Sequence, residues 1–321
     1  MVLTVTINPL LERRYYYPEL NLLSVNRNGK VILKAGGKGI NVNRQLNKLD
    51  VQNSALLFTG GSNGKLYRDT LRAEGINFSD LKIRNETRDA AIIIDETDNK
   101  IFSFFGTDPS ISSSEVDEFI TKMAKAIATC EIVVFSGSSP CKESEIIFLE
   151  GIKIANELDK ISVCDTYGAH LKNCLNASPT IIHNNIDEVR NSLGLELNSE
   201  GDFKLFLLNL YKNGIKQAYI TNAEKPLYAS NFDFHYKATL PQISTVDSTG
   251  SGDAFVAGIV YGWTKKLKFE DQLKLACALG ISNAQSVEVC DVEFEKAESI
   301  VNEIRIDSIG KKLKEINDSS G

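Results

Sequence analysis

Short apolar segments alternate with longer amphipathic ones along most of this chain. The segments Val2–Ile7, Ile132–Phe135 and Ile161–Cys164 are apolar almost throughout, and stretches such as Glu145–Leu158 and Gly201–Lys212 carry apolar residues at helical spacing. Strands that are apolar along their whole length are buried on both faces, which is typical of a parallel sheet covered by helices. The pattern, which continues through the strand-like Thr180–His183 and Gln217–Thr221, predicts an α/β fold whose ligands bind at the carboxyl ends of the strands.

Three segments interrupt this rhythm. Alternating residues at Asn28–Leu33, and a matching pair at Asp89–Glu96 and Lys100–Gly106 around a turn, indicate strands of a small antiparallel sheet. A capping box of Ser112 and Glu115 starts a helix after them. The last residues, 311–321, are polar and predict a frayed tail.

Composition excludes several classes of protein. The 321 residues carry a net charge of −6, which argues against a nucleic-acid partner. No run of 18 apolar residues and no basic-then-apolar leader is present, so we expect a cytoplasmic protein without a membrane partner. The six cysteines form no C-x-x-C pair and are expected to be reduced core thiols, and the three histidines lack metal-ligand spacing.

The run Thr249-Gly250-Ser251-Gly252-Asp253 is the strongest functional signal. Small residues let backbone N–H groups converge on an anion, and the apolar stretch that follows predicts a buried helix whose positive end points at the same place. Asp253 lies at that end, where a carboxylate can take a proton. An anion hole beside a base suits phosphoryl transfer to a hydroxyl, although a plain turn that starts a helix explains the run equally well.

A second glycine cluster, Gly36-Gly37-Lys38-Gly39, precedes another helix with Val42, Leu46 and Leu49 on one face. Neither cluster is a Walker loop, because no Gly-x-x-x-x-Gly-Lys-[Ser/Thr] occurs. Two helix starts suited to anions predict two phosphate-bearing ligands.

Taken together, Asn8-Pro9, the Ala-Gly-Gly-Lys-Gly-x-Asn-Val run and the Thr-Gly-Ser-Gly-Asp run resemble the ribokinase-like (PfkB-type) carbohydrate kinases in order and spacing. The likeness is greatest to their sugar-phosphate branch, the 1-phosphofructokinases and tagatose-6-phosphate kinases, and extends from residue 3 to about 305. It implies a three-layer α/β/α domain over residues 1–310, with a mainly parallel sheet and a small antiparallel β lid from about 12–34 and 88–106. It also implies an ATP-dependent kinase of a sugar phosphate that uses Mg²⁺.

The resemblance assigns roles around the transferred phosphoryl group. It makes Asp253 the general base and Gly250, Ser251 and Gly252 the anion hole. The alternatives are an aspartate that only caps its helix and a tight turn.

On the acceptor side, the likeness places Lys38 and Arg88 near the phosphate of the sugar, which two cations would hold well. The alternative is a pair of solvated surface charges. Asn41 matches a residue that binds sugar hydroxyls, or it caps its helix. Glu12 stands where the family usually has Asp, so the pocket or the sugar must differ, unless Glu12 is a surface residue. The remaining matches to the acceptor site are Gly36, Gly37 and Asp165.

On the nucleotide side, Asn185 and Glu188 reproduce the family's Asn-x-x-Glu, which organises Mg²⁺ and phosphates partly through water. Residues three apart on a helix share a face, so both side chains could point into one site, although this motif is common by chance. The likeness adds Thr221, Thr249, Gly250 and Gly252 to the nucleotide contacts, with Glu188 reaching the metal through water.

The departures from the family gather around the nucleotide. Ala223 and Pro226 replace two glycines of a loop, which should exclude the positive φ angles of the family, and Val289 adds bulk near the expected adenine. Two alternatives therefore remain: a degenerate relative that binds a sugar phosphate without turnover, and a kinase of an unphosphorylated sugar or nucleoside. We also expect a homodimer through the lids, because a small sheet cannot bury both of its faces.

Overall fold

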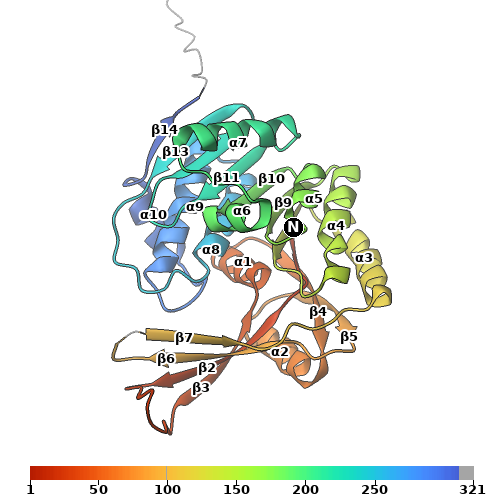
Figure 1. Ribbon diagram of the computed structural model, residues 1–321, viewed down its shortest axis with the longest axis vertical. Coiled ribbons are helices and arrows are strands. Elements are labelled where there is room, and N and C mark those ends of the chain that lie inside the picture. Colours follow the sequence, from red (N-terminus) through yellow and green to blue (C-terminus); the bar gives the residue numbers. More distant parts are fainter. Residues whose placement is uncertain (99, 311–321) are drawn as a thin grey trace, which may run out of the picture.

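The computed structural model describes residues 1–98 and 100–310, and its largest element is a ten-stranded sheet (Figure 1). Its order is β14-β13-β12-β11-β10-β9-β8-β1-β4-β5. The run from β11 to β5 is parallel, and β12, β13 and β14 extend one edge by antiparallel pairing. The strands are β1 (Val2–Thr6), β4 (Asn53–Gly60), β5 (Phe78–Ile83), β8 (Ile132–Gly137), β9 (Ile161–Thr166), β10 (Ile181–Asn185), β11 (Gln217–Thr221), β12 (Leu227–Asn231), β13 (Phe234–Thr239) and β14 (Arg305–Ser308).

Helices cover both faces of this sheet because successive side chains of each buried strand point to opposite sides. Leu3 of β1 faces a core that contains Phe148 and Leu207, whereas its neighbour Val2 faces a second core that contains Val256. The first face carries α3 (Ser113–Ala128), α4 (Ile146–Glu157), α5 (Leu171–Asn176), α6 (Ile186–Leu193) and α7 (Glu200–Lys212). The second carries α1 (Lys38–Lys48), α8 (Ser251–Thr264), α9 (Phe269–Ala284) and α10 (Phe294–Val301).

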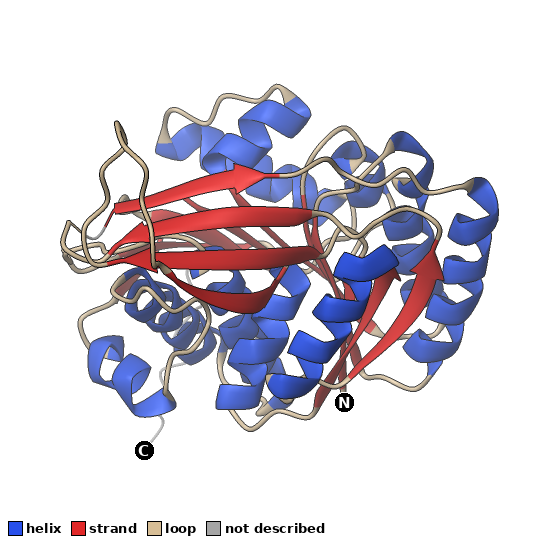
Figure 2. Cartoon of the chain, turned by 90° about the horizontal axis from the view of Figure 1, so that it is seen from below, coloured by secondary structure: helices blue, strands red, loops and turns tan. Residues whose placement is uncertain are grey.

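A four-stranded sheet, the lid, projects from this body, and Figure 2 shows it spread in front of the main sheet. Its order is β3-β2-β6-β7, built from β2 (Leu10–Tyr17), β3 (Lys30–Gly36), β6 (Asp89–Asp95) and β7 (Lys100–Phe105). The outer pairs are antiparallel and the central β2–β6 pair is parallel. Leu11 and Ala35 anchor the base of the lid on Tyr67 of α2 (Gly61–Ala73).

The predicted three-layer α/β/α fold with a lid is confirmed. The capping box of Ser112 and Glu115 does begin α3. One boundary differs: α8 begins at Ser251, so Asp253 lies within its first turn instead of before it. The polar tail predicted over 311–321 lies outside the described residues.

The cysteines agree with the expectation of core thiols. All six cysteines are free, and five of them are buried. Within residues 1–98 and 100–310, no helix combines the length and the apolar character that crossing a bilayer requires.

Candidate active site

Two helix starts meet at the carboxyl edge of the main sheet. Gly37 precedes α1 with a φ of 120°, and Gly250 precedes α8 with a φ of 79°, both in the region that favours glycine. The amide of Asn41 on α1 donates a hydrogen bond of 2.7 Å to Oδ2 of Asp253 on α8. The two motifs, more than 200 residues apart in the chain, therefore form one site.

Asp253 is almost fully enclosed, with 3% of its surface exposed. Neither expected alternative role is seen: the N-cap of α8 is Gly250 with no side-chain cap, and Asn41 lies inside α1 instead of capping it. Burial raises the pKa of Asp253 to about 6, with Asp165 adding to the effect while Lys38 and Asn41 oppose it. A carboxylate with this pKa accepts a proton more readily than an exposed one and still ionises at neutral pH.

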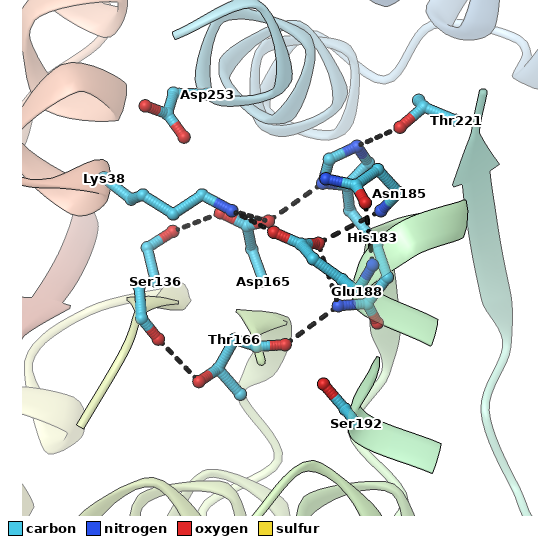
Figure 3. A network of polar contacts seen from close by, with 12 residues as sticks. Lys38, Ser136, Asp165, Thr166, His183, Asn185, Glu188, Ser192, Thr221 and Asp253 are labelled. Atoms are coloured by element: carbon cyan, nitrogen blue, oxygen red, sulfur yellow. Dashed lines mark hydrogen bonds and ion pairs between the residues drawn. The ribbon is translucent and has the colours of Figure 1, made fainter. Parts of the chain in front are cut away.

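Lys38 lies at the centre of a group of charges (Figure 3). Its Nζ is 3.3 Å from Oδ1 of Asp165 and 3.1 Å from Oε1 of Glu188, and it lies over the ring of Tyr167. Burial alone would lower the pKa of Lys38, but Asp165, Glu188 and Asp253 together raise it above its usual value. The ammonium group is therefore a fixed positive charge beside Asp253.

Asp165 is the next-to-last residue of β9 and is completely buried. Its Oδ1 contacts Nδ1 of His183 at 2.9 Å, and its Oδ2 accepts a hydrogen bond of 2.8 Å from the hydroxyl of Ser136. Burial would raise the pKa of Asp165, but Lys38 and His183 lower it below its usual range. Asp165 thus stays ionised and holds Lys38 in place.

His183 and Ser136 were not predicted as site residues. Both lie near the carboxyl ends of buried strands, β10 and β8. Their position near strand ends could have marked them as site residues, but histidine and serine are common at such positions, so position alone does not identify a site. His183 also links to Thr221, which the sequence assigned to the nucleotide, since its Nε2 lies 3.4 Å from Oγ1 of Thr221.

Asn185 and Glu188 form a reciprocal cap at the start of α6. The N–H of Glu188 donates to Oδ1 of Asn185 at 2.8 Å, and the N–H of Asn185 donates to Oε2 of Glu188 at 3.0 Å. The carboxylate of Glu188 also reaches Lys38, and the cap keeps the side chain of Asn185 next to it.

These contacts also test the expected magnesium site. Both carboxylate oxygens of Glu188 already have protein donors. No cluster of three or more His, Cys, Asp or Glu side chains suited to a metal occurs in the part of the chain that the structure describes. Mg²⁺ keeps several waters and is often held by substrate phosphates, so Glu188 fits a water-linked contact better than direct coordination.

Residues 249–251 are tied to α9. Nδ2 of Asn283 donates to the carbonyl of Thr249 at 2.8 Å and to the hydroxyl of Ser251 at 3.2 Å. The N–H of Thr249 donates to Asp247. The hydrogen bonds from Asn283 therefore hold the turn before α8 in one conformation, and this fixes the direction of its N–H groups.

Glu12, which the sequence assigned to the acceptor, lies on β2 of the lid. Its Oε2 accepts a hydrogen bond of 2.8 Å from Nε of Arg14, and its Oε1 lies where a side chain at Gly36 would collide with it. The absence of a side chain at Gly36 leaves room for this close approach. Arg14, which was not predicted, is buried, and its charge balances that of Glu12.

Arg88 belongs to a different network from Lys38. Its Nη1 is 3.0 Å from Oδ1 of Asp108, and its Nη2 donates to the carbonyl of Asn8 at 3.1 Å. Lys38 is held by Asp165 and Glu188 instead. The two cations that the sequence assigned to one phosphate thus have separate partners.

The expectation for the nucleotide loop is wrong on one point. Ala223 adopts a φ of 47°, so the loop keeps a left-handed residue despite the loss of glycine. Such a conformation costs an L-residue roughly 1–2 kcal/mol. Val289 is buried against Gly250, so its bulk supports the turn before α8.

A parallel sheet, two glycine-started helices and a buried carboxylate between them define a phosphotransferase. The chain belongs to the pfkB family of carbohydrate kinases: the model of that family matches residues 11–295. The protein is therefore an ATP-dependent phosphotransferase, as the sequence predicted.

Individual relatives agree with this assignment. The tagatose-6-phosphate kinase of Staphylococcus epidermidis is 29% identical over 309 residues, which cover 95% of this chain and 99% of that protein. The 1-phosphofructokinase of Borreliella burgdorferi is 29% identical over 313 residues, which cover 96% and 99%. A crystal structure of phosphofructokinase-2 from Escherichia coli has a TM-score of 0.86 with 17% identity, covers 94% of this chain and 98% of its own, and supports the fold alone.

Proposed function

We propose that this enzyme transfers the γ-phosphoryl group of ATP to a hydroxyl of a sugar phosphate of the fructose 1-phosphate or tagatose 6-phosphate class. The observation that carries the proposal is the position of Asp253, buried, held by Asn41 and next to the helix start at Gly250. The names of the relatives supply the substrate class.

In this mechanism, Asp253 takes the proton of the attacking hydroxyl. The N–H groups of Gly250, Ser251 and Gly252 stabilise the charge on the phosphoryl group, because they are fixed before the reaction begins. Lys38 adds a positive charge beside the same point. Mg²⁺, when bound with ATP, would neutralise phosphate charge, and Glu188 would hold it through water.

We further propose that residues 1–310 form one catalytic domain, with the lid covering the acceptor. Glu12 and Gly36 approach the sugar from the lid side, and Asp165 orients Lys38. Thr221 and Thr249 border the nucleotide phosphates, next to Asn185.

A screen of acceptors tests the proposal. ADP release is measured with fructose 1-phosphate, fructose 6-phosphate, tagatose 6-phosphate, fructose, ribose and adenosine. We expect turnover with at least one sugar phosphate and none with the unphosphorylated compounds. Turnover with an unphosphorylated compound alone, or with none, would reject the proposal.

Replacing Arg88 by alanine tests how the acceptor is held. A charge-assisted hydrogen bond contributes roughly 1.5–3 kcal/mol, so Arg88→Ala should raise the KM for the sugar phosphate about ten-fold or more. The KM for ATP should stay unchanged in steady-state assays. The matched control is Arg72→Ala on the surface of α2, where Arg72 pairs with Asp69 and lies over the ring of Phe78. Equal effects on both substrates would contradict the role.

The exposed apolar side chains of the lid lead us to expect a homodimer. Several apolar side chains of the lid are mostly exposed: Leu23 (98%) and Val25 (77%) in the β2–β3 connection, and Phe104 (62%) and Phe105 (61%) at the end of β7. Exposed apolar side chains on a small sheet favour burial against a second copy. We expect light scattering to give twice the mass of one chain at micromolar concentration and Phe104→Glu to give a monomer. A monomeric wild-type protein would refute the homodimer.

A further inference from the structure

A cluster of polar residues lies where the lid meets the main sheet. It joins Asn8 after β1, Arg88 before β6, Ser138 after β8 and Asp108 in the segment between β7 and α3. The amide of Asn8 donates to Oδ1 of Asp108 at 3.0 Å and to the hydroxyl of Ser138 at 3.1 Å. Arg88 donates to the same oxygen of Asp108 and to the carbonyl of Asn8. Asp108 is thus the shared partner of Arg88 and Asn8.

Two polar atoms of this cluster lack a partner. Nε of Arg88 and Oδ1 of Asn8 are buried, and neither has a hydrogen bond with any residue in the described part of the chain. Asn8 as a whole is 4% exposed. A buried polar group without a partner is unfavourable and calls for an explanation. One unpaired donor and one unpaired acceptor indicate a place for a ligand that carries both kinds of group.

The members of the cluster differ in their freedom to move. The side chain of Arg88 is 17% exposed and is held on two sides, whereas the side chain of Asp108 is 45% exposed in a segment without regular structure. Asp108 can therefore turn into solvent while Arg88 and Asn8 stay. Its carboxylate also neutralises the cation to which a phosphate would bind, and two anions cannot share Arg88 without strong repulsion.

We propose that Asp108 is a displaceable placeholder: it holds Arg88 in position in the free enzyme and gives way to the phosphate of the acceptor. A dianionic phosphate can displace it because phosphate brings more charge and several acceptor oxygens. A neutral sugar cannot, so Asp108 sets the selectivity for phosphorylated acceptors. This inference rests on the proposed function.

The variant Asp108→Asn tests the proposal, because it keeps an acceptor oxygen for Arg88 and Asn8 but removes the charge. We expect the KM for the sugar phosphate to fall about three- to ten-fold. The half-exposed ion pair between Asp108 and Arg88 no longer competes with the phosphate, and the carboxylate no longer repels it. The kcat should change less than about two-fold, since Asp108 has no contact with Asp253. The control Asp69→Asn removes the same charge from the surface pair with Arg72 and should leave the KM unchanged.

Calorimetric titration with inorganic phosphate, without nucleotide, gives a second readout. Phosphate should bind Asp108→Asn more tightly than wild type, and the gain should vanish when Arg88→Ala is added, which separates this position from the anion hole at Gly250. An unchanged or raised KM, or a gain that survives the loss of Arg88, would overturn the proposal. If Asp108→Asn gains phosphate affinity through Arg88 but no sugar phosphate is turned over, the proposed function fails while the placeholder role stands.

Discussion

Asp253→Asn should lower kcat by about 10²- to 10⁴-fold and leave both KM values nearly unchanged. Removing a general base has an effect of this order. The amide is isosteric with the carboxylate, and its oxygen still accepts the hydrogen bond from Asn41, so the site keeps its shape. Steady-state assays with saturating ATP and sugar phosphate measure the change. Turnover near the wild-type value would rule out Asp253 as the base.

The pH dependence of the wild-type enzyme provides an independent test. The pKa of Asp253 is raised to about 6, and the base must be ionised to act. Activity should therefore rise through about pH 6 and level off above it, and the residual activity of Asp253→Asn should lack this step. A wild-type profile that is flat between pH 5 and 7 would contradict the assignment.

The stability of the same variant should change in the opposite direction to its activity. A buried acid with a raised pKa binds its proton more tightly in the folded state, so stability is lost as the pH rises from about 3.8 to about 6, and the loss is complete above that range. At pH 8 the raised pKa lowers the free energy of unfolding by about 3 kcal/mol. Asp253→Asn should restore part of this free energy, which urea denaturation measures. The matched control is Asp202→Asn, at the equivalent third position of α7. Hydrogen bonds from Ser199 lower the pKa of Asp202, so this control should lose stability and keep full activity.

Lys38→Met is expected to damage both stability and catalysis. The replacement keeps the apolar stem and removes the charge that lies between Asp165 and Glu188. Removing one partner of a buried ion pair typically costs about 3–5 kcal/mol, because the remaining charge is left uncompensated. Because the Lys38 side chain is 23% exposed and Asp165 keeps its contacts with His183 and Ser136, the free energy of unfolding at pH 8 should fall by less than that amount, and kcat should fall as well because a positive charge beside Asp253 is lost.

A double variant separates the two effects. Adding Asp165→Asn to Lys38→Met removes the uncompensated carboxylate and should restore much of the stability. Activity should stay low, since the cation is still missing. If Lys38→Met alone is as stable as the wild type, or if the double variant recovers activity, the central position of Lys38 in the site is refuted.

The sequence predicted those features that depend on near neighbours in the chain. Alternation of buried strands and helices gave the three-layer fold, and the glycines before α1 and α8 marked two helix starts. Both glycines do adopt positive φ angles, and Asp253 could be chosen as the base from its place after the second.

Contacts between distant segments were decided by the tertiary structure. The parallel β2–β6 pair, which joins strands about 70 residues apart, could not be foreseen from the alternation within each strand. The partners of Lys38 and Arg88 were likewise beyond the sequence. Both cations were assigned to one phosphate, but each is held by carboxylates from other parts of the fold.

The physical reason lies in the range of the interactions. Backbone dihedral preferences and hydrophobic periodicity act over a few residues, so they can be read along the chain. The pKa of Asp253, the pairing of His183 with Asp165 and the neutralisation of Arg88 by Asp108 depend on burial and on charges brought together only by packing. The sequence by itself determined where the helices and the proposed base lie, and only the tertiary structure decided which charges surround them.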